Sequence, residues 1–96
     1  MLESKFQSDL IKEIEDKLDG AIVLKNDPNY IQGIPDLSVF YKGKWAALEC
    51  KKNKRAGHQA NQDWYVEQMN SMSFARFVFP ENKEEVVDEL LRFFTC

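Results

Sequence analysis

The chain has 96 residues, of which 44% are hydrophobic and 30% charged, with a formal net charge of −3. This length fits one domain, residues 1–96, and the composition excludes a disordered chain. No apolar run reaches membrane-spanning length, and the charged start MLESKFQSDL is not typical of a signal peptide. Two cysteines are too few for a disulfide scaffold, so we expect a cytoplasmic protein that does not contact membranes.

The first predicted element is an amphipathic helix that ends before Gly20. Its apolar face repeats every four residues, at Leu2, Phe6, Leu10, Ile14 and Leu18. The stretch AIVLKN that follows predicts a short buried strand. DPNYIQGIP predicts a loop because prolines and a glycine interrupt it.

The rest of the chain predicts a hairpin, a helix, a strand and a last helix. DLSVFY and KWAALECKK are strand-like, with Lys-Gly between them, and NKRAG is a basic loop. HQANQDWYVEQMNSM has apolar residues at helical spacing, FARFVF predicts a strand, and Pro80 and Glu81 open the last helix. The predicted order is α-β-β-β-α-β-α, an α/β (α+β) fold.

Three charged residues fall where the hairpin should enter a core. If Lys42 and Gly43 form a two-residue turn, the pairing places Asp36 opposite Glu49. Opposed side chains have Cβ atoms about 4.5–5.5 Å apart, so the two carboxylates would repel each other. A divalent cation would remove this repulsion, and Mg²⁺ prefers oxygen ligands. Lys51 lies two residues beyond Glu49 and therefore points to the same face of the sheet.

Structural explanations compete with this interpretation. An Asp after GIP is usually a turn residue, and ECKK is usually an exposed strand end. Lys-Gly is also not the best pair for a two-residue turn, and a bulged turn would shift the register by one residue. The combination of register, charge and a following basic loop nevertheless favours a functional site.

GIPD, a gap of 12 residues and then ECK resemble the signature of the PD-(D/E)xK nuclease superfamily. With a Gln in the next helix, the chain is most similar to the VRR-NUC branch of small phage-type nucleases, which are related to Holliday-junction resolvases. The resemblance covers nearly the whole chain. It implies a restriction-endonuclease-like core with a central mixed sheet flanked by helices. It also implies a location in the host-cell cytoplasm if the source is viral.

The activity that this resemblance implies is metal-dependent hydrolysis of phosphodiester bonds in DNA, selective for branched or Holliday-junction-like structures. Asp36 and Glu49 would hold Mg²⁺, which Mn²⁺ could replace, with the Cys50 backbone carbonyl as a third ligand. Lys51 would orient or help deprotonate a water molecule. Glu3 could add a carboxylate from the first helix, as in other family members. Alternatively, Glu3 only stabilises the positive end of that helix.

The family also implies a catalytic glutamine in the helix after Glu-x-Lys. Gln62 is the first choice because it shares a helical face with Val66 and Met69, which leans toward the sheet. Gln59, one turn earlier, is the second choice and a candidate DNA contact. The alternative for both residues is a polar helix surface.

The stretch from Lys42 to Arg55 is a basic stripe in which Glu49 is the only acid. Lys52, Lys54 and Arg55 are predicted contacts of the DNA backbone, or else a solvated loop. His58 follows this loop and is either a DNA contact or a helix-start residue.

The aromatic residues Trp45, Trp64 and Tyr65 are expected in the core. Phenylalanines left exposed on the last helix would form an apolar patch and a natural homodimer surface. Two other functions compete with a structure-selective endonuclease. One is a nicking or restriction-type DNA nuclease, and the other is a non-catalytic nucleic-acid-binding accessory protein on the same fold.

Overall fold

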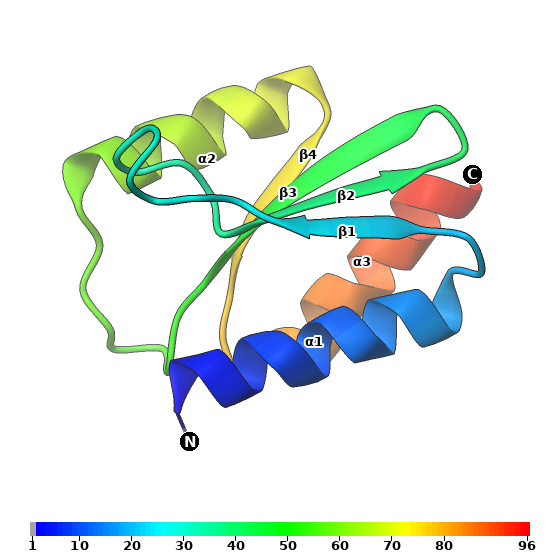
Figure 1. The fold of residues 1–96 in the computed structure, drawn as a ribbon, viewed down its shortest axis with the longest axis horizontal. Helices are drawn as coiled ribbons and strands as arrows, with labels where there is room; N and C mark the ends of the chain where they lie inside the picture. Colours follow the sequence, from blue (N-terminus) through cyan, green and yellow to red (C-terminus); the bar gives the residue numbers. More distant parts are fainter. Residues whose placement is uncertain (1) are drawn as a thin grey trace.

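The computed structural model describes residues 2–96 and confirms the predicted order of elements (Figure 1). The elements are α1 (Glu3–Lys17), β1 (Ile22–Lys25), β2 (Leu37–Tyr41), β3 (Lys44–Cys50), α2 (Ala60–Met72), β4 (Phe74–Val78) and α3 (Lys83–Thr95). α3 begins later than predicted, because Pro80 and Glu81 lie in a turn in which the Asn82 side chain bonds to the Phe79 N–H. None of these helices is long and apolar enough to cross a membrane.

The four strands form one mixed sheet in the order β1-β2-β3-β4. β1, β2 and β3 are antiparallel neighbours, whereas β4 runs parallel to β3. Lys42 and Gly43 both have positive φ, 47° and 81°, as a two-residue hairpin turn of this kind requires. The register therefore runs without interruption from Tyr41–Lys44 to Leu37–Leu48, and the predicted unbulged hairpin is confirmed.

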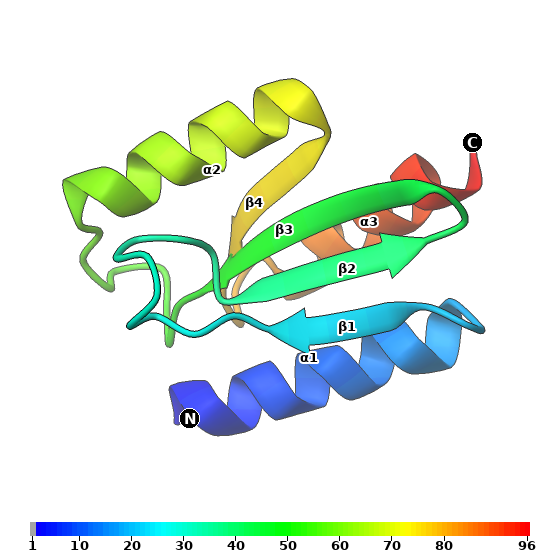
Figure 2. The same cartoon turned by 45° about the horizontal axis from the view of Figure 1, so that its top comes forward.

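Helices lie on both faces of the sheet (Figures 1 and 2). α1 and α3 cover one face, where the main core forms. It includes Phe6, Leu10, Ile14, Leu37, Val39, Leu48, Val86, Leu90 and Phe94. α2 lies on the other face and packs Val66 against Ala47 of β3 and Ala75 of β4. The sheet is therefore fully covered on one face and half covered on the other.

β1 is not the buried strand that its sequence predicts. It is an edge strand, and the side chains of Ile22 and Leu24 are 58% and 49% exposed. The reason is that α2 contacts β3 and β4, so the β1–β2 half of this face has no helix above it. Phe40, which pairs with Ile22, is also exposed there.

The aromatic residues differ from the prediction in two respects. Phe94 is buried and Phe93 packs against the core, so the predicted apolar patch on α3 is absent from the described structure. Trp64 is 56% exposed, because Gln62 and Val66 face the sheet and Trp64 points away from that face of α2. Trp45 is partly buried against the α2 cluster, as expected.

Candidate metal centre at the end of the hairpin

Asp36 is held at the point where the chain enters β2. Its Oδ2 accepts a hydrogen bond from the backbone N–H of Cys50, at 2.8 Å. The backbone N–H of Asn26 donates to the Asp36 carbonyl at 2.8 Å, and the Asn26 side chain donates to Pro35 O and Ser38 Oγ. These bonds close the loop between β1 and β2 and fix the Asp36 carboxylate against the end of β3.

Glu49, Lys51 and Gln62 form a connected polar group beside Asp36. Glu49 is only 3% exposed and Lys51 only 8%. The Lys51 ammonium lies 3.8 Å from Glu49 Oε2 and donates to Gln62 Oε1 at 2.7 Å. The Gln62 side chain in turn donates to Glu49 Oε2 at 3.2 Å. The structure therefore brings together four of the residues predicted for catalysis.

Gln62 owes its position to the start of α2. Gln59 is the N-cap residue, and the two glutamines form a reciprocal capping box in which Gln62 Oε1 accepts the Gln59 backbone N–H at 3.1 Å. Gln62 also faces the sheet on the same side of α2 as buried Val66, as predicted. Helix capping thus sets the orientation of the amide that joins Lys51 to Glu49.

Burial raises the pKa of both acidic groups in this site. For Glu49, burial and then the negative charge of Asp36 raise the pKa to about 8, and Lys51 compensates only in part. For Asp36, burial raises the pKa although the Cys50 N–H stabilises the carboxylate. The two carboxyl groups are close enough to share a hydrogen bond when one is protonated. The negative charge of one carboxylate therefore disfavours ionisation of the other.

A divalent cation fits this donor set. Glu49 Oε1 is buried and has no hydrogen-bond partner among residues 2–96. Asp36 and Glu49 both line a cavity of about 480 Å³, together with Gln59, Gln62 and residues of the β1–β2 loop. A buried carboxylate oxygen without a donor beside a second carboxylate is the arrangement that a hard cation satisfies.

The structure gives less support to Glu3 and Cys50 as metal ligands. The Glu3 side chain is exposed at the start of α1 and does not line the cavity. Within residues 2–96 there is no cluster of three or more His, Cys, Asp or Glu side chains that could hold a metal. Burial raises the pKa of the Cys50 thiol, which therefore stays protonated at neutral pH. Only its backbone carbonyl remains a predicted ligand.

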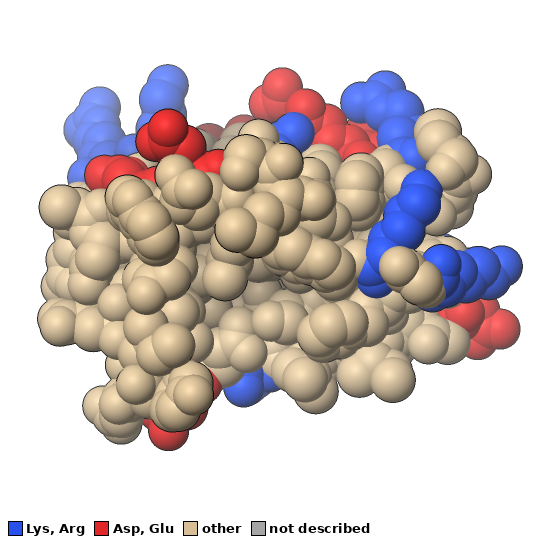
Figure 3. All heavy atoms as spheres, turned by 90° about the horizontal axis from the view of Figure 1, so that it is seen from above, with Lys and Arg blue, Asp and Glu red and all other residues tan. Residues whose placement is uncertain are grey.

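The predicted basic stripe does not form one surface. Lys44 donates to the Phe93 and Cys96 carbonyls at the far end of β3, about 23 Å of extended strand from Lys51. In Figure 3 the Lys and Arg side chains lie in separate groups at the margins of the face seen from above. The prediction was wrong because these residues are neighbours in the sequence but lie along β3, whose two ends are on opposite sides of the molecule.

The exposed basic residues near the site are Lys52, Lys54 and Arg55, in the loop between β3 and α2. His58 is also exposed, but its ring stacks on Phe77 with the centroids 4.0 Å apart, and its Nδ1 lies 2.9 Å from Asp63 Oδ1. These contacts favour the helix-start role for His58. Lys52, Lys54, Arg55 and Gln59 stay predicted DNA contacts.

Asn26 and Asn61 are the residues of this site that sequence reasoning missed. Asn26 closes the loop that carries Asp36, and Asn61 of α2 donates to the Gln32 carbonyl in the same loop at 3.0 Å. Neither residue belongs to a motif, because each acts only through a partner distant in the sequence. Gly33 was a weak sequence signal for this loop, because glycine readily adopts a positive φ, and its φ here is +94°.

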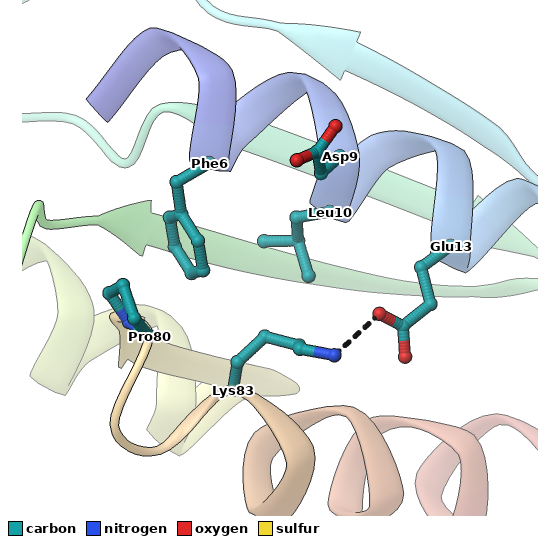
Figure 4. A pocket seen from close by; sticks show the side chains of 6 residues that line it. All are labelled: Phe6, Asp9, Leu10, Glu13, Pro80 and Lys83. Atoms are coloured by element: carbon teal, nitrogen blue, oxygen red, sulfur yellow. Dashed lines mark hydrogen bonds and ion pairs between the residues drawn. The ribbon is translucent and has the colours of Figure 1, made fainter. Parts of the chain in front are cut away.

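A second cavity, of about 310 Å³, lies between α1 and α3 (Figure 4). Phe6, Leu10 and Pro80 form its apolar lining. Lys83 reaches across it to Glu13, with the ammonium 2.8 Å from Glu13 Oε1. The Glu13 carboxylate is paired closely here, whereas the ammonium nearest to Glu49 lies 3.8 Å away.

The comparisons with known proteins add no relative to this description. No model of a protein family, no curated protein and no solved structure matches the chain.

Proposed function

We propose that the protein is a metal-dependent endonuclease that hydrolyses phosphodiester bonds in DNA. The observation that carries the proposal is the buried Glu49 Oε1, which has no hydrogen-bond partner within residues 2–96 and lies near Asp36 and Lys51. A protein gains no stability from a buried carboxylate beside a second, half-buried one, so the presence of both favours a functional role. The resemblance to PD-(D/E)xK nucleases rests on these same residues.

Asp36 and Glu49 are the proposed ligands of Mg²⁺ or Mn²⁺. When bound, such an ion polarises the phosphate and lowers the pKa of a water molecule. The Cys50 N–H fixes one carboxylate and the Gln62 amide fixes the other, so both are oriented before any ion arrives. This preorganisation reduces the cost of assembling the site.

Lys51 is the proposed group that acts on the phosphate or on the attacking water. Its ammonium is held by Gln62 Oε1 and lies near Glu49, so it is fixed and largely removed from solvent. A positive charge in this setting stabilises the negative charge that develops on the phosphate oxygens more strongly than it would in water. Gln62 is a positioning residue for Lys51.

DNA is favoured over a small phosphate ester by the surroundings of the site. Lys52, Lys54 and Arg55 extend from the end of β3 into solvent, where they can contact successive phosphates of a strand. The preference for branched duplexes follows from the family resemblance alone. The homodimer was predicted from phenylalanines exposed on α3; Phe94 is buried and Phe93 packs against the core, so the dimer stays a prediction without that support. A two-fold dimer would allow symmetric cuts in two strands.

The test is cleavage of supercoiled plasmid and of a synthetic four-way junction with Mg²⁺, Mn²⁺ or EDTA. We expect metal-dependent cutting that falls by about 10²–10⁴-fold in Lys51→Ala, because the lost charge acts mainly in the transition state. Lys12→Ala is the control, since Lys12 is an exposed residue of α1. Binding without cutting in the unaltered protein would instead identify the non-catalytic accessory protein.

A further inference from the structure

The loop between β1 and β2 carries an exposed aromatic side chain on a well-anchored backbone. The two ends of the loop are joined by the bond from the Asn26 N–H to the Asp36 carbonyl. Within the loop, Asp27 accepts the backbone N–H of Asn29 through its side chain and that of Tyr30 through its carbonyl. These bonds form a tight turn at the base of Tyr30.

The same loop is fixed to α2. Asn61 donates to the Gln32 carbonyl at 3.0 Å, and its side chain packs against Gly33. A Cβ atom at Gly33 would lie only 2.6 Å from Asn61 Cγ, so the contact is too close for any other residue. Figures 1 and 2 show the loop beside the first turns of α2. The position of the loop relative to Gln62 is therefore set.

Tyr30 lies in the loop whose residues line the cavity of the candidate metal centre. Its neighbours Pro28, Asn29 and Gln32 line the same cavity as Asp36 and Glu49. The Tyr30 side chain is 80% exposed and is followed by Ile31, which is 37% exposed. An aromatic ring that contributes little to the core, on a loop fixed at both ends and at α2, is available for a ligand with a flat apolar face.

We propose that Tyr30 stacks on a DNA base that is unpaired or unstacked next to the scissile phosphate. The inference rests on the proposed nuclease function and assigns its substrate class: DNA with a free base, as at a junction, flap or bulge. In a continuous duplex both faces of each base are covered by neighbouring bases, so no base face is free to stack on Tyr30. A base released from the stack offers its face to an aromatic ring, which is a recurrent mode of recognition.

The experiment uses the Lys51→Ala background with Mg²⁺, so that DNA is bound without being cut. The probes are a duplex with one bulged 2-aminopurine and the fully paired duplex of equal length. We expect Tyr30→Leu to weaken binding of the bulged DNA by about 5- to 100-fold, ~1–3 kcal/mol at 1.4 kcal/mol per factor of ten. Binding of the paired duplex stays within about twofold, because this contact is absent there.

The controls and a second readout test stacking itself. Tyr30→Phe keeps the ring and retains both the affinity and the quenching of 2-aminopurine fluorescence, whereas Tyr30→Leu loses the quenching. Phe40→Leu alters another exposed aromatic residue, on the open half of the sheet, and leaves both readouts unchanged.

Three results would overturn the inference. Equal losses on bulged and paired DNA would make Tyr30 a general DNA contact. Unchanged binding of both probes by Tyr30→Leu, while the protein with Lys51 intact cuts DNA, would refute the stacking role and leave the nuclease proposal intact. A protein that neither binds nor cuts DNA with any metal would refute both proposals together.

Discussion

Glu13 and Glu49 are both partly or fully buried glutamates beside a lysine, yet their surroundings have opposite effects. Glu13 accepts hydrogen bonds from Lys17 and Lys83, each at 2.8 Å, and these contacts lower its pKa. Glu49 lies near a second carboxylate, and one of its oxygens has no hydrogen-bond partner in the described part of the chain. Burial raises the pKa of Glu49 to about 8. The protein compensates the charge of Glu13 fully and that of Glu49 only in part.

The difference distinguishes a structural ion pair from the proposed metal site. At the α1–α3 cavity two ammonium groups neutralise Glu13, so no further ligand is needed there. At the end of the hairpin, Lys51 is shared with Gln62 and lies 3.8 Å from Glu49, which leaves two carboxylates with one cation. The deficit of positive charge is what a divalent ion would supply.

The largest expected effect concerns metal binding and cleavage. Glu49→Gln should abolish Mg²⁺-dependent cutting, with a loss of about 10³-fold or more, because it removes a proposed ligand. Isothermal titration of Mn²⁺ should show a parallel loss of binding. Glu13→Gln is the matched control, with the same chemical change in the compensated glutamate, and should keep full activity and metal binding. Equal losses in the two variants would remove the distinction drawn between them.

The pH dependence of stability should be the next largest effect. The pKa of Glu49 is about 8 in the folded protein against the ordinary value of 4.5, so the folded state binds more protons between these values. In EDTA, the free energy of unfolding should therefore fall as pH rises from about 5 to 9, by about 2–4 kcal/mol. Urea denaturation at a series of pH values and constant ionic strength measures this change in the free energy of unfolding.

Two comparisons sharpen this pH prediction. Glu49→Gln removes the titrating group, so most of the slope should disappear. Mg²⁺ should stabilise the unaltered protein increasingly as pH rises, because it binds the ionised carboxylates of the folded state. A free energy of unfolding that stays level in EDTA between pH 5 and 9 would show that Glu49 titrates normally.

The smallest expected effect is the loss of stability when the ion pairs of Glu13 are removed. Glu13→Gln should lower the free energy of unfolding at pH 7 by about 0.2–1 kcal/mol, the range measured for exposed ion pairs. Because the pKa of Glu13 is lowered, its contribution is lost as pH falls below the ordinary value of 4.5. The difference in thermal midpoint between the variant and the unaltered protein should therefore shrink as the pH falls below 4.5. A difference that does not shrink would point to lost packing instead.

Local rules explain which parts of the fold and site were predictable. The four-residue repeat of α1 and the two-residue turn at Lys42 and Gly43 depend on neighbours in the sequence, and both are confirmed. The turn fixed the hairpin register, and the register placed Asp36 near Glu49. The capping box likewise follows from a three-residue spacing, although its link to Lys51 does not.

The errors arose where an outcome depends on packing between distant elements. β1 was expected to be buried, but α2 covers only the other half of the sheet. The basic stripe was read along a strand whose ends are far apart, and Trp64 lies on the outer side of α2.

The sequence by itself determined the order of elements, the hairpin register and the closeness of Asp36 to Glu49, because strand period and turn geometry are local properties. Only the tertiary structure decided that Gln62 joins Lys51 to Glu49 and that Asn61 anchors the Tyr30 loop. Those contacts depend on how α2 lies across β3 and β4, which is set by packing of the whole chain and not by any short stretch of it.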